Sequence, residues 1–273
     1  MTATQQDRLL RFADIVKREL DASGRSVALV SRSGLSLERF GIRYSHAGVS
    51  LKASENGAWS VRQLYFACDE GRPRLFDQGM AGFASGTDDP ALGYISIVLL
   101  PHDQGAVLER AALDRARALQ LIGSTYSANA YPFALRYQNC NQWLIELIAS
   151  AWGALDVAGP SVRPQAQQWL AEQGYAPAEV QSIAPWWWLA AAFVPWLRFD
   201  DHPELDRAAA RVRTSLPSSI EAFVRERVPG AERIELCHDS RRVVVRRGWT
   251  PIASGCHPAP GDRLVEFGET QRL

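Results

Sequence analysis

The stretch from Asn139 to Gly153 reads NCNQWLIELIASAWG, and it decides the fold prediction. Its apolar residues recur at spacings of three and four, the period of a helix with a buried face. These residues are Trp143, Leu144, Leu147, Ile148 and Ala151. Gly153 is a stop signal, so the sequence predicts a helix over 139–152. Cys140 then lies at the helix N-terminus, where unpaired amides and the helix dipole stabilise a thiolate.

Two extended segments precede this helix. Residues 43–52 (RYSHAGVSLK) and 59–68 (WSVRQLYFAC) are rich in β-forming residues, and Asn56-Gly57 between them is a strong hairpin signal. The sequence therefore predicts an antiparallel hairpin with His46 within its first strand. A third strand is predicted at 91–100, just before Pro101.

The remaining elements follow from periodicity and from stop signals. Helices are predicted at 7–22 and 104–121, with a short strand at 26–31. Beyond Pro160 the pattern predicts helices at 163–173, 177–183, 186–193 (WWWLAAAF), 203–212 and 218–228, and strands at 234–238 and 242–247. We expect a catalytic core over residues 1–159, and over 160–273 a mostly helical extension with terminal strands, packed on that core.

A thiol nucleophile needs a base that can reach it. Among the five histidines, only His46 lies in the middle of a predicted strand, where a rigid backbone can aim the ring. The best dyad that the sequence offers is Cys140 with His46. Gln63, on the facing strand, is the polar residue we expect to orient the imidazole, because its amide oxygen can accept the ring N–H.

These segments carry a family resemblance. Residues 137–143 (YQNCNQW) and 44–49 (YSHAGV) resemble the cysteine helix and the histidine strand of circularly permuted NlpC/P60 hydrolases, in which the histidine strand comes first. More narrowly, RYSHAGVSL, LFDQGMAGF, GYISIVLLP and YSANAYPFALRYQNCNQWLIELIA resemble the bacterial DUF2145 family, over roughly residues 25–250. The resemblance implies an α+β fold: a permuted papain-like core with a small antiparallel sheet, plus the helical extension.

The same resemblance implies a thiol hydrolase or acyltransferase that acts on an amide or ester bond through a Cys140 thioester. The substrates used by such folds are peptides, peptidoglycan stems and lipids, and no cofactor or metal is implied. Tyr44, Tyr137 and Asn139 are candidates for oxyanion stabilisation or substrate binding. Relatives often carry a second histidine or an acid where this chain has Gln63. A binding or scaffold protein that kept the fold without the activity is therefore the alternative.

Three other motifs have competing interpretations. The pairs Cys237-His238 and Cys256-His257 invite a zinc site, but adjacent strand residues point to opposite faces, which leaves a Cys237–Cys256 disulfide or two inert thiols. The run Trp186-Trp187-Trp188 fits either a buried cluster or a surface for a partner or lipid. Asp200-Asp201-His202 resembles a metal-binding fragment, although a helix start explains the aspartates equally well.

Composition excludes some classes of partner. With 30 basic and 30 acidic residues there is no basic excess, which argues against nucleic acid. The most apolar stretch, residues 183–199, is too short for a membrane-spanning helix and contains two prolines. The N-terminus as written has no secretory signal. The sequence leaves the localisation open: cytoplasmic as written, and periplasmic if a leader was removed before Met1.

Overall fold

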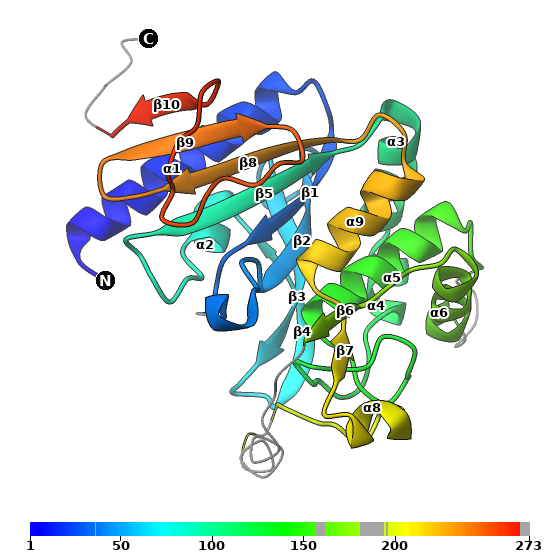
Figure 1. Cartoon of the computed structure of the whole chain (residues 1–273). Helices are drawn as coiled ribbons and strands as arrows, with labels where there is room; N and C mark the ends of the chain where they lie inside the picture. Colours follow the sequence, from blue (N-terminus) through cyan, green and yellow to red (C-terminus); the bar gives the residue numbers. More distant parts are fainter. Residues whose placement is uncertain (36, 157–161, 181–193, 195, 268–273) are drawn as a thin grey trace. The chain divides into compact units, whose positions relative to one another are not determined.

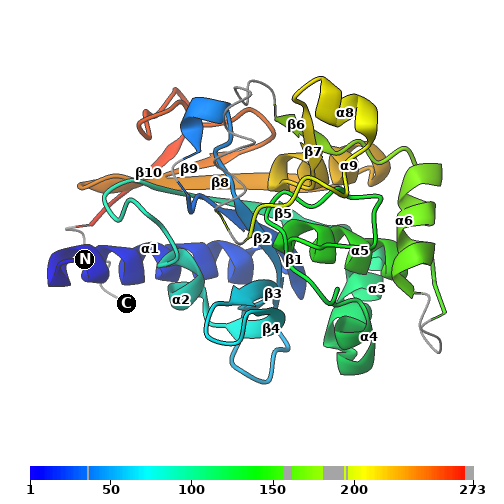
Figure 2. The same cartoon turned by 90° about the horizontal axis from the view of Figure 1, so that it is seen from below.

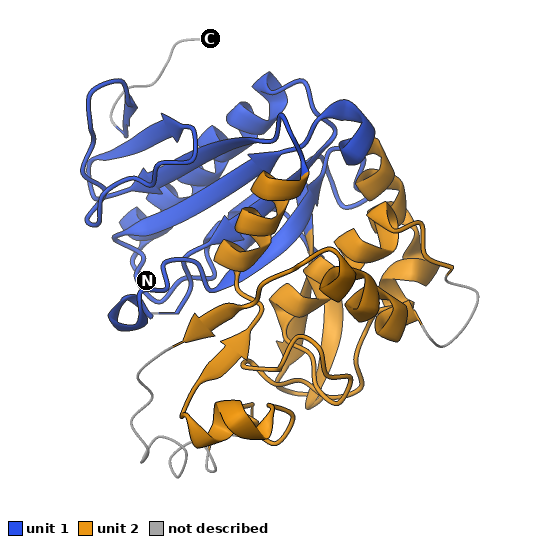
Figure 3. Cartoon of the chain, turned by 45° about the vertical axis from the view of Figure 1, so that its right-hand side comes forward, with its two compact units in different colours: residues 1–61, 77–105, 228–273 blue, residues 62–76, 106–227 orange. Residues whose placement is uncertain are grey.

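The computed structural model describes residues 1–273 except 36, 157–161, 181–193, 195 and 268–273. The chain is an α+β protein with a large sheet and several helices (Figure 1). It forms two compact units: unit 1 holds residues 1–61, 77–105 and 228–273, and unit 2 holds residues 62–76 and 106–227 (Figure 3). The division expected from the sequence, at residue 159, stays a prediction.

Over the described residues, the large sheet has eight strands in the order β10-β9-β8-β5-β1-β2-β3-β4. Every neighbouring pair from β10 to β2 is antiparallel. The strands are β1 (Val27–Arg32), β2 (His46–Leu51), β3 (Ser60–Ala67), β4 (Arg72–Gln78), β5 (Gly93–Leu99), β8 (Glu232–His238), β9 (Arg242–Arg247) and β10 (Arg263–Glu266). The expected small sheet is wrong in size, because the strands after residue 228 pair with β5 and extend the sheet.

Helix α1 (Ala3–Ala22) lies along one side of the unit 1 strands (Figure 2). A capping box starts it: the Thr2 hydroxyl accepts the Gln5 amide, and the Gln5 side chain accepts the Thr2 amide. Its apolar residues, the short helix α2 (Met80–Ala84) and the strands share one hydrophobic cluster. Burial of this face is the main stabilising term for unit 1.

A second hydrophobic cluster of unit 1 contains Cys237 and Val244, whose strand neighbours Leu236 and Val243 belong to the first cluster. Because successive strand residues point to opposite faces, the second cluster covers the other face of the sheet. Cys237 forms a disulfide with Cys256, with 5.7 Å between their Cα atoms. Of the two outcomes that the sequence left open, the structure has the disulfide.

Unit 2 is mainly helical. Its elements include α3 (His102–Leu113, which begins in unit 1), α4 (Arg115–Gln120), α5 (Cys140–Trp152), α6 (Val162–Glu172), α8 (Glu204–Ala208) and α9 (Pro217–Arg227). β6 (Ala178–Val180) and β7 (Val212–Thr214) pair in a small antiparallel sheet. Every residue of α5 from Cys140 to Ala151 is buried, so α5 is the central element of the unit.

Three predicted helices differ from the structure. The helix expected at 104–121 breaks at Asp114, whose carboxylate caps α4 by accepting two amides of its first turn. The helix expected at 177–183 is wrong, because residues 178–180 pair with β7. The helix expected at 203–212 ends early, and Val212 begins that partner strand. In both cases strand pairing across the unit overrides local propensity. The helix expected at 186–193, which contains the three tryptophans, lies outside the described residues.

None of the helices within the described ranges combines the length and the apolar character that crossing a membrane requires.

His238 gives unit 1 a pH-dependent stability. Its side chain is buried beside Phe12, with ring centroids 4.6 Å apart, and this burial lowers the pKa of His238. At a pH between the folded and unfolded pKa values of His238, the unfolded chain binds a proton at this residue and the folded chain does not. The contribution of His238 to the free energy of unfolding is complete above the ordinary histidine pKa of about 6.5. It is lost as the pH falls toward the lower pKa of the folded state.

We expect His238→Phe to flatten this dependence. Urea unfolding of wild type at about pH 7.5 and about pH 5.5 should give a lower free energy of unfolding at acid pH, by up to about 1.4 kcal/mol per pH unit crossed. The variant should lose less between the same two conditions. An equal loss in both proteins would contradict the assignment.

Candidate active site

Cys140 is the first residue of α5, as the sequence predicts. Asn139 caps the helix: its side-chain oxygen accepts the Gln142 amide at 2.6 Å. The side-chain nitrogen of Asn139 donates to the Thr214 hydroxyl at 2.8 Å and to the carbonyl of Ala128 at 3.2 Å. The cap therefore ties the helix start to two other segments of unit 2. The Cys140 thiol lies where first-turn amides and the dipole favour a negative sulfur.

A tyrosine hydroxyl contacts this thiol. The Tyr126 side chain is hydrogen-bonded to Cys140, and its ring lies 5.2 Å from that of Phe66 on β3, measured between centroids. Burial raises the pKa of Tyr126 well above its ordinary value, and the negative charge of the Cys140 thiolate and the hydrogen bond raise it further. Tyr126 thus stays a neutral donor, and a hydroxyl donating to a thiolate stabilises the thiolate.

The backbone holds Tyr126 against the segment that leads into α5. Tyr126 and Gln138 form an isolated parallel bridge. The Ser127 amide donates to the Gln138 carbonyl at 3.1 Å, and the Gln138 amide donates to the Thr125 carbonyl at 3.0 Å. Backbone hydrogen bonds between residues 125–127 and Gln138 therefore hold Tyr126 close to Cys140.

Glu146 fixes the same segment from inside the helix. Its carboxylate is fully buried and accepts the Gln138 side-chain amide at 2.6 Å, Arg163 Nε at 2.8 Å and the Gln167 side-chain amide at 2.8 Å. Arg163 also donates to the Tyr137 carbonyl at 3.3 Å. A buried charge needs such partners, and here they are the residues that set the loop before Cys140.

The structure assigns the other predicted residues to different units. His46 is the first residue of β2 in unit 1, opposite Arg32 on β1, with its ring centroid 6.1 Å from that of Phe83. Gln63 lies on β3 in unit 2 and is buried. The roles of His46 as base and Gln63 as orienting group stay predictions.

The candidate oxyanion residues have other contacts. The Tyr44 hydroxyl donates to the buried carboxylate of Glu235 in unit 1. The Tyr137 hydroxyl donates to Asp200 at 3.2 Å, and burial together with this bond raises the pKa of Tyr137. Asn139 uses its side-chain oxygen and nitrogen for the cap contacts. Each of these groups is thus engaged within its own unit, and their proposed roles toward substrate stay predictions.

Sequence reasoning missed Tyr126 and Glu146 as members of the site. Tyr126 comes from a loop, where no period relates it to Cys140. Glu146 did leave a signal, because it is the single charged residue within the apolar run LIELIASA. A lone carboxylate on a buried helix implies partners elsewhere in the chain.

Asp201 and His202 form a buried pair of their own, with His202 Nδ1 3.0 Å from a carboxylate oxygen of Asp201. The other oxygen of Asp201 accepts the Tyr131 amide at 2.8 Å. The helix-start interpretation of Asp201 is wrong, because Pro203 is the N-cap of α8. Among the residues with described positions, no group of three or more potential ligands could hold a metal ion.

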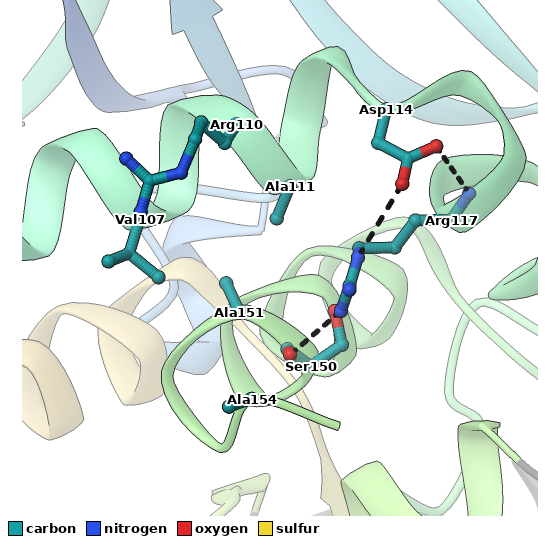
Figure 4. A pocket seen from close by; sticks show the side chains of 8 residues that line it. All are labelled: Val107, Arg110, Ala111, Asp114, Arg117, Ser150, Ala151 and Ala154. Atoms are coloured by element: carbon teal, nitrogen blue, oxygen red, sulfur yellow. Dashed lines mark hydrogen bonds and ion pairs between the residues drawn. The ribbon is translucent and has the colours of Figure 1, made fainter. Parts of the chain in front are cut away.

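A surface hollow of about 200 Å³ lies between α3, α4 and the end of α5 (Figure 4). Arg117 crosses it and donates to the Ser150 carbonyl at 2.9 Å, which caps the C-terminus of α5. Asp114 on its rim caps α4. Asp114 and Arg117 therefore serve helix ends in this hollow.

The geometry defines an α+β protein with a thiol at the start of a buried central helix. Residues 19–224 match the family model described as "Uncharacterized protein conserved in bacteria (DUF2145)". The match covers well over half of the chain, and the chain therefore belongs to the DUF2145 family. Neither the curated proteins nor the solved structures contain a significant match to it.

The Tyr126 hydroxyl should lower the pH at which Cys140 reacts. Hydrogen bonds to charged groups contribute about 1.5–3 kcal/mol, so Tyr126→Phe should move the midpoint of Cys140 alkylation by iodoacetamide upward by about one pH unit or more. Tyr131→Phe removes a hydroxyl from the same loop and should leave the midpoint unchanged. Equal midpoints in wild type and Tyr126→Phe would remove the role given to this bond.

Glu146 and Arg163 should behave as a coupled buried pair. Glu146→Leu leaves the Arg163 charge buried without its carboxylate and should cost about 3–5 kcal/mol of unfolding free energy. The double variant Glu146→Leu with Arg163→Met removes both charges and should be clearly more stable than the single variant. A double-mutant cycle by urea unfolding checks this, and additive losses would show that the pair is not coupled.

Proposed function

We propose that this chain is a cysteine-dependent hydrolase or acyltransferase acting on an amide or ester bond. The observation that carries the proposal is the Cys140 thiol at the N-terminus of α5, hydrogen-bonded to the Tyr126 hydroxyl. Both features favour the thiolate, which is the nucleophilic form of cysteine. A cysteine of the buried core that served only packing would need neither.

The proposed reaction is acyl transfer. The Cys140 sulfur attacks the carbonyl carbon, and His46, the base selected from the sequence, takes the thiol proton and returns it to the leaving amine or alcohol. This leaves a thioester on Cys140. Water or another acceptor then attacks the thioester, donates its proton to the base and releases the acyl product as the thiol re-forms. Gln63 is proposed to orient the imidazole.

The finer fold proposal is a permuted NlpC/P60 core. It is supported by the order of a histidine strand before a cysteine helix, with His46 beginning β2 and Cys140 beginning α5. The proposed substrates are small molecules, peptides, peptidoglycan stems or lipids, as in the proteins that the sequence resembles.

A catalytically inactive binding or scaffold protein of the same fold is the second candidate. Two observations favour it: the Cys140 side chain is only 6% exposed, and Gln63 is neutral where a stronger acceptor would stabilise an imidazolium. This candidate expects a thiol that reacts slowly at every pH.

Thiol labelling separates the two candidates. Wild type, Cys140→Ser and His46→Ala are treated with iodoacetamide between about pH 5 and about pH 9, and mass spectrometry quantifies each cysteine. The exposed Cys68 is the internal reference. We expect Cys140 to react faster than Cys68 at about pH 6, and His46→Ala to remove most of that advantage.

Hydrolysis of p-nitrophenyl acetate gives the second measurement. We expect Cys140→Ser to abolish turnover and His46→Ala to slow it about 100-fold or more. If Cys140 reacts more slowly than Cys68 at every pH and Cys140→Ser hydrolyses as fast as wild type, the enzyme proposal fails.

A further inference from the structure

Unit 1 contains a fully buried carboxylate, that of Glu235 on β8. One of its oxygens accepts the Tyr44 hydroxyl, and the same oxygen lies 3.1 Å from Arg43 Nη1. The other oxygen accepts the Ile252 amide at 2.5 Å. Arg233 pairs with the carboxylate at 3.1 Å. Four donors from three parts of unit 1 therefore converge on one side chain.

The charge of Glu235 is maintained by these partners. Burial would raise the pKa of Glu235, but Arg233, the Tyr44 hydroxyl and the Ile252 amide outweigh burial and hold it below its ordinary value. Glu235 is therefore ionised at neutral pH and acts as a permanent acceptor for the segment before β2.

The disulfide secures the loop that supplies the Ile252 amide. Cys256 is bonded to Cys237, which lies two residues after Glu235 on the same strand. The Cys256 amide donates to the Tyr94 hydroxyl at 2.9 Å. The Ile252 carbonyl accepts Arg43 Nη1 at 2.6 Å, so the loop binds both Glu235 and its partner. The Cys237–Cys256 disulfide thus fixes the loop whose Ile252 amide binds Glu235.

The Glu235 cluster consists of Glu235, Arg43, Tyr44, Arg233 and Ile252. It fixes the chain immediately before His46. Arg43 and Tyr44 precede β2, and His46 is its first residue. The last anchor before the strand is the Ser45 amide, which donates to the Arg32 carbonyl at 3.2 Å. Strand ends open locally at low cost, so the first residue of a strand depends on what holds the chain upstream. Glu235 holds Arg43 and Tyr44, the two residues immediately upstream of Ser45.

We propose that Glu235 is a positioning residue for His46: by binding Arg43 and Tyr44 against the disulfide-linked loop, it prevents the start of β2 from fraying. Tyr44, a sequence candidate for substrate contact, then also positions the strand that carries His46. The inference rests on the proposed function only for its catalytic consequence, since the Glu235 cluster itself is a property of unit 1.

The test compares Glu235→Gln and Tyr44→Phe with wild type. Glu19→Gln is the matched control, because Glu19 is a mostly buried carboxylate of unit 1 that pairs with Arg247 and Arg263, both outside the cluster. Three properties are measured: amide exchange of the peptide 43–51, C2–H exchange of each histidine by mass spectrometry, and the rate of p-nitrophenyl acetate hydrolysis.

We expect faster amide exchange in 43–51 and altered C2–H exchange at His46 in both cluster variants, with His102 and His257 unchanged. The kcat should fall roughly 10-fold to 100-fold with little change in KM, as expected when a catalytic group is misplaced. Glu19→Gln should change none of these properties, even where it lowers the melting temperature by a similar amount.

The outcomes separate this inference from the proposed function. If the exchange of 43–51 and His46 is the same in Glu235→Gln as in wild type, the positioning role is overturned, whatever the activity. If exchange changes but kcat does not, the Glu235 cluster acts only on structure and the positioning role again fails. If wild type and Cys140→Ser hydrolyse equally, the proposed function fails, while the exchange data still decide whether the Glu235 cluster fixes the start of β2.

Discussion

The carboxylate of Glu146 is fully buried in the central helix of unit 2, and a charge in that position is stable only when donors surround it. Gln138, Arg163 and Gln167 supply those donors. Because Gln138 also bridges to Tyr126, satisfying the charge fixes the loop that carries the tyrosine hydroxyl. The position of the Cys140 thiol relative to its donor therefore follows from the need to solvate one buried carboxylate.

Unit 1 also contains a buried carboxylate that needs donors around it. Glu235 is equally buried, yet its partners come from a strand neighbour, from the segment before β2 and from a loop held by a disulfide. Replacing such a network by apolar groups often costs little stability, so the buried charge is not by itself a source of stability. In both units the buried charge orders a segment beside a residue of the candidate site.

The parts of the fold that sequence could predict are those set by local patterns. The helix beginning at Cys140 follows from apolar spacing and a cap. In the connection between β2 and β3, Gly57 has a positive φ of 110°, a conformation that glycine adopts readily. The break at Asp114 was missed because the apolar period continues through it. The partners of Glu146 could not be predicted from the sequence, since no spacing rule joins α5 to Arg163 or to the loop of Tyr126.

The Tyr126 hydroxyl that contacts the Cys140 thiol is neutral, and the amides of the first turn of α5 carry no formal charge. First-turn amides and the Tyr126 hydroxyl stabilise a thiolate without supplying a counter-charge. The raised pKa of Tyr126 keeps its proton in place wherever a thiol titrates. A thiolate held only by an imidazolium loses that support when the histidine deprotonates, and the two groups titrate as a coupled pair. The neutral donors act whatever the charge of the histidine, so their effect is to lower the pH at which the Cys140 thiolate forms.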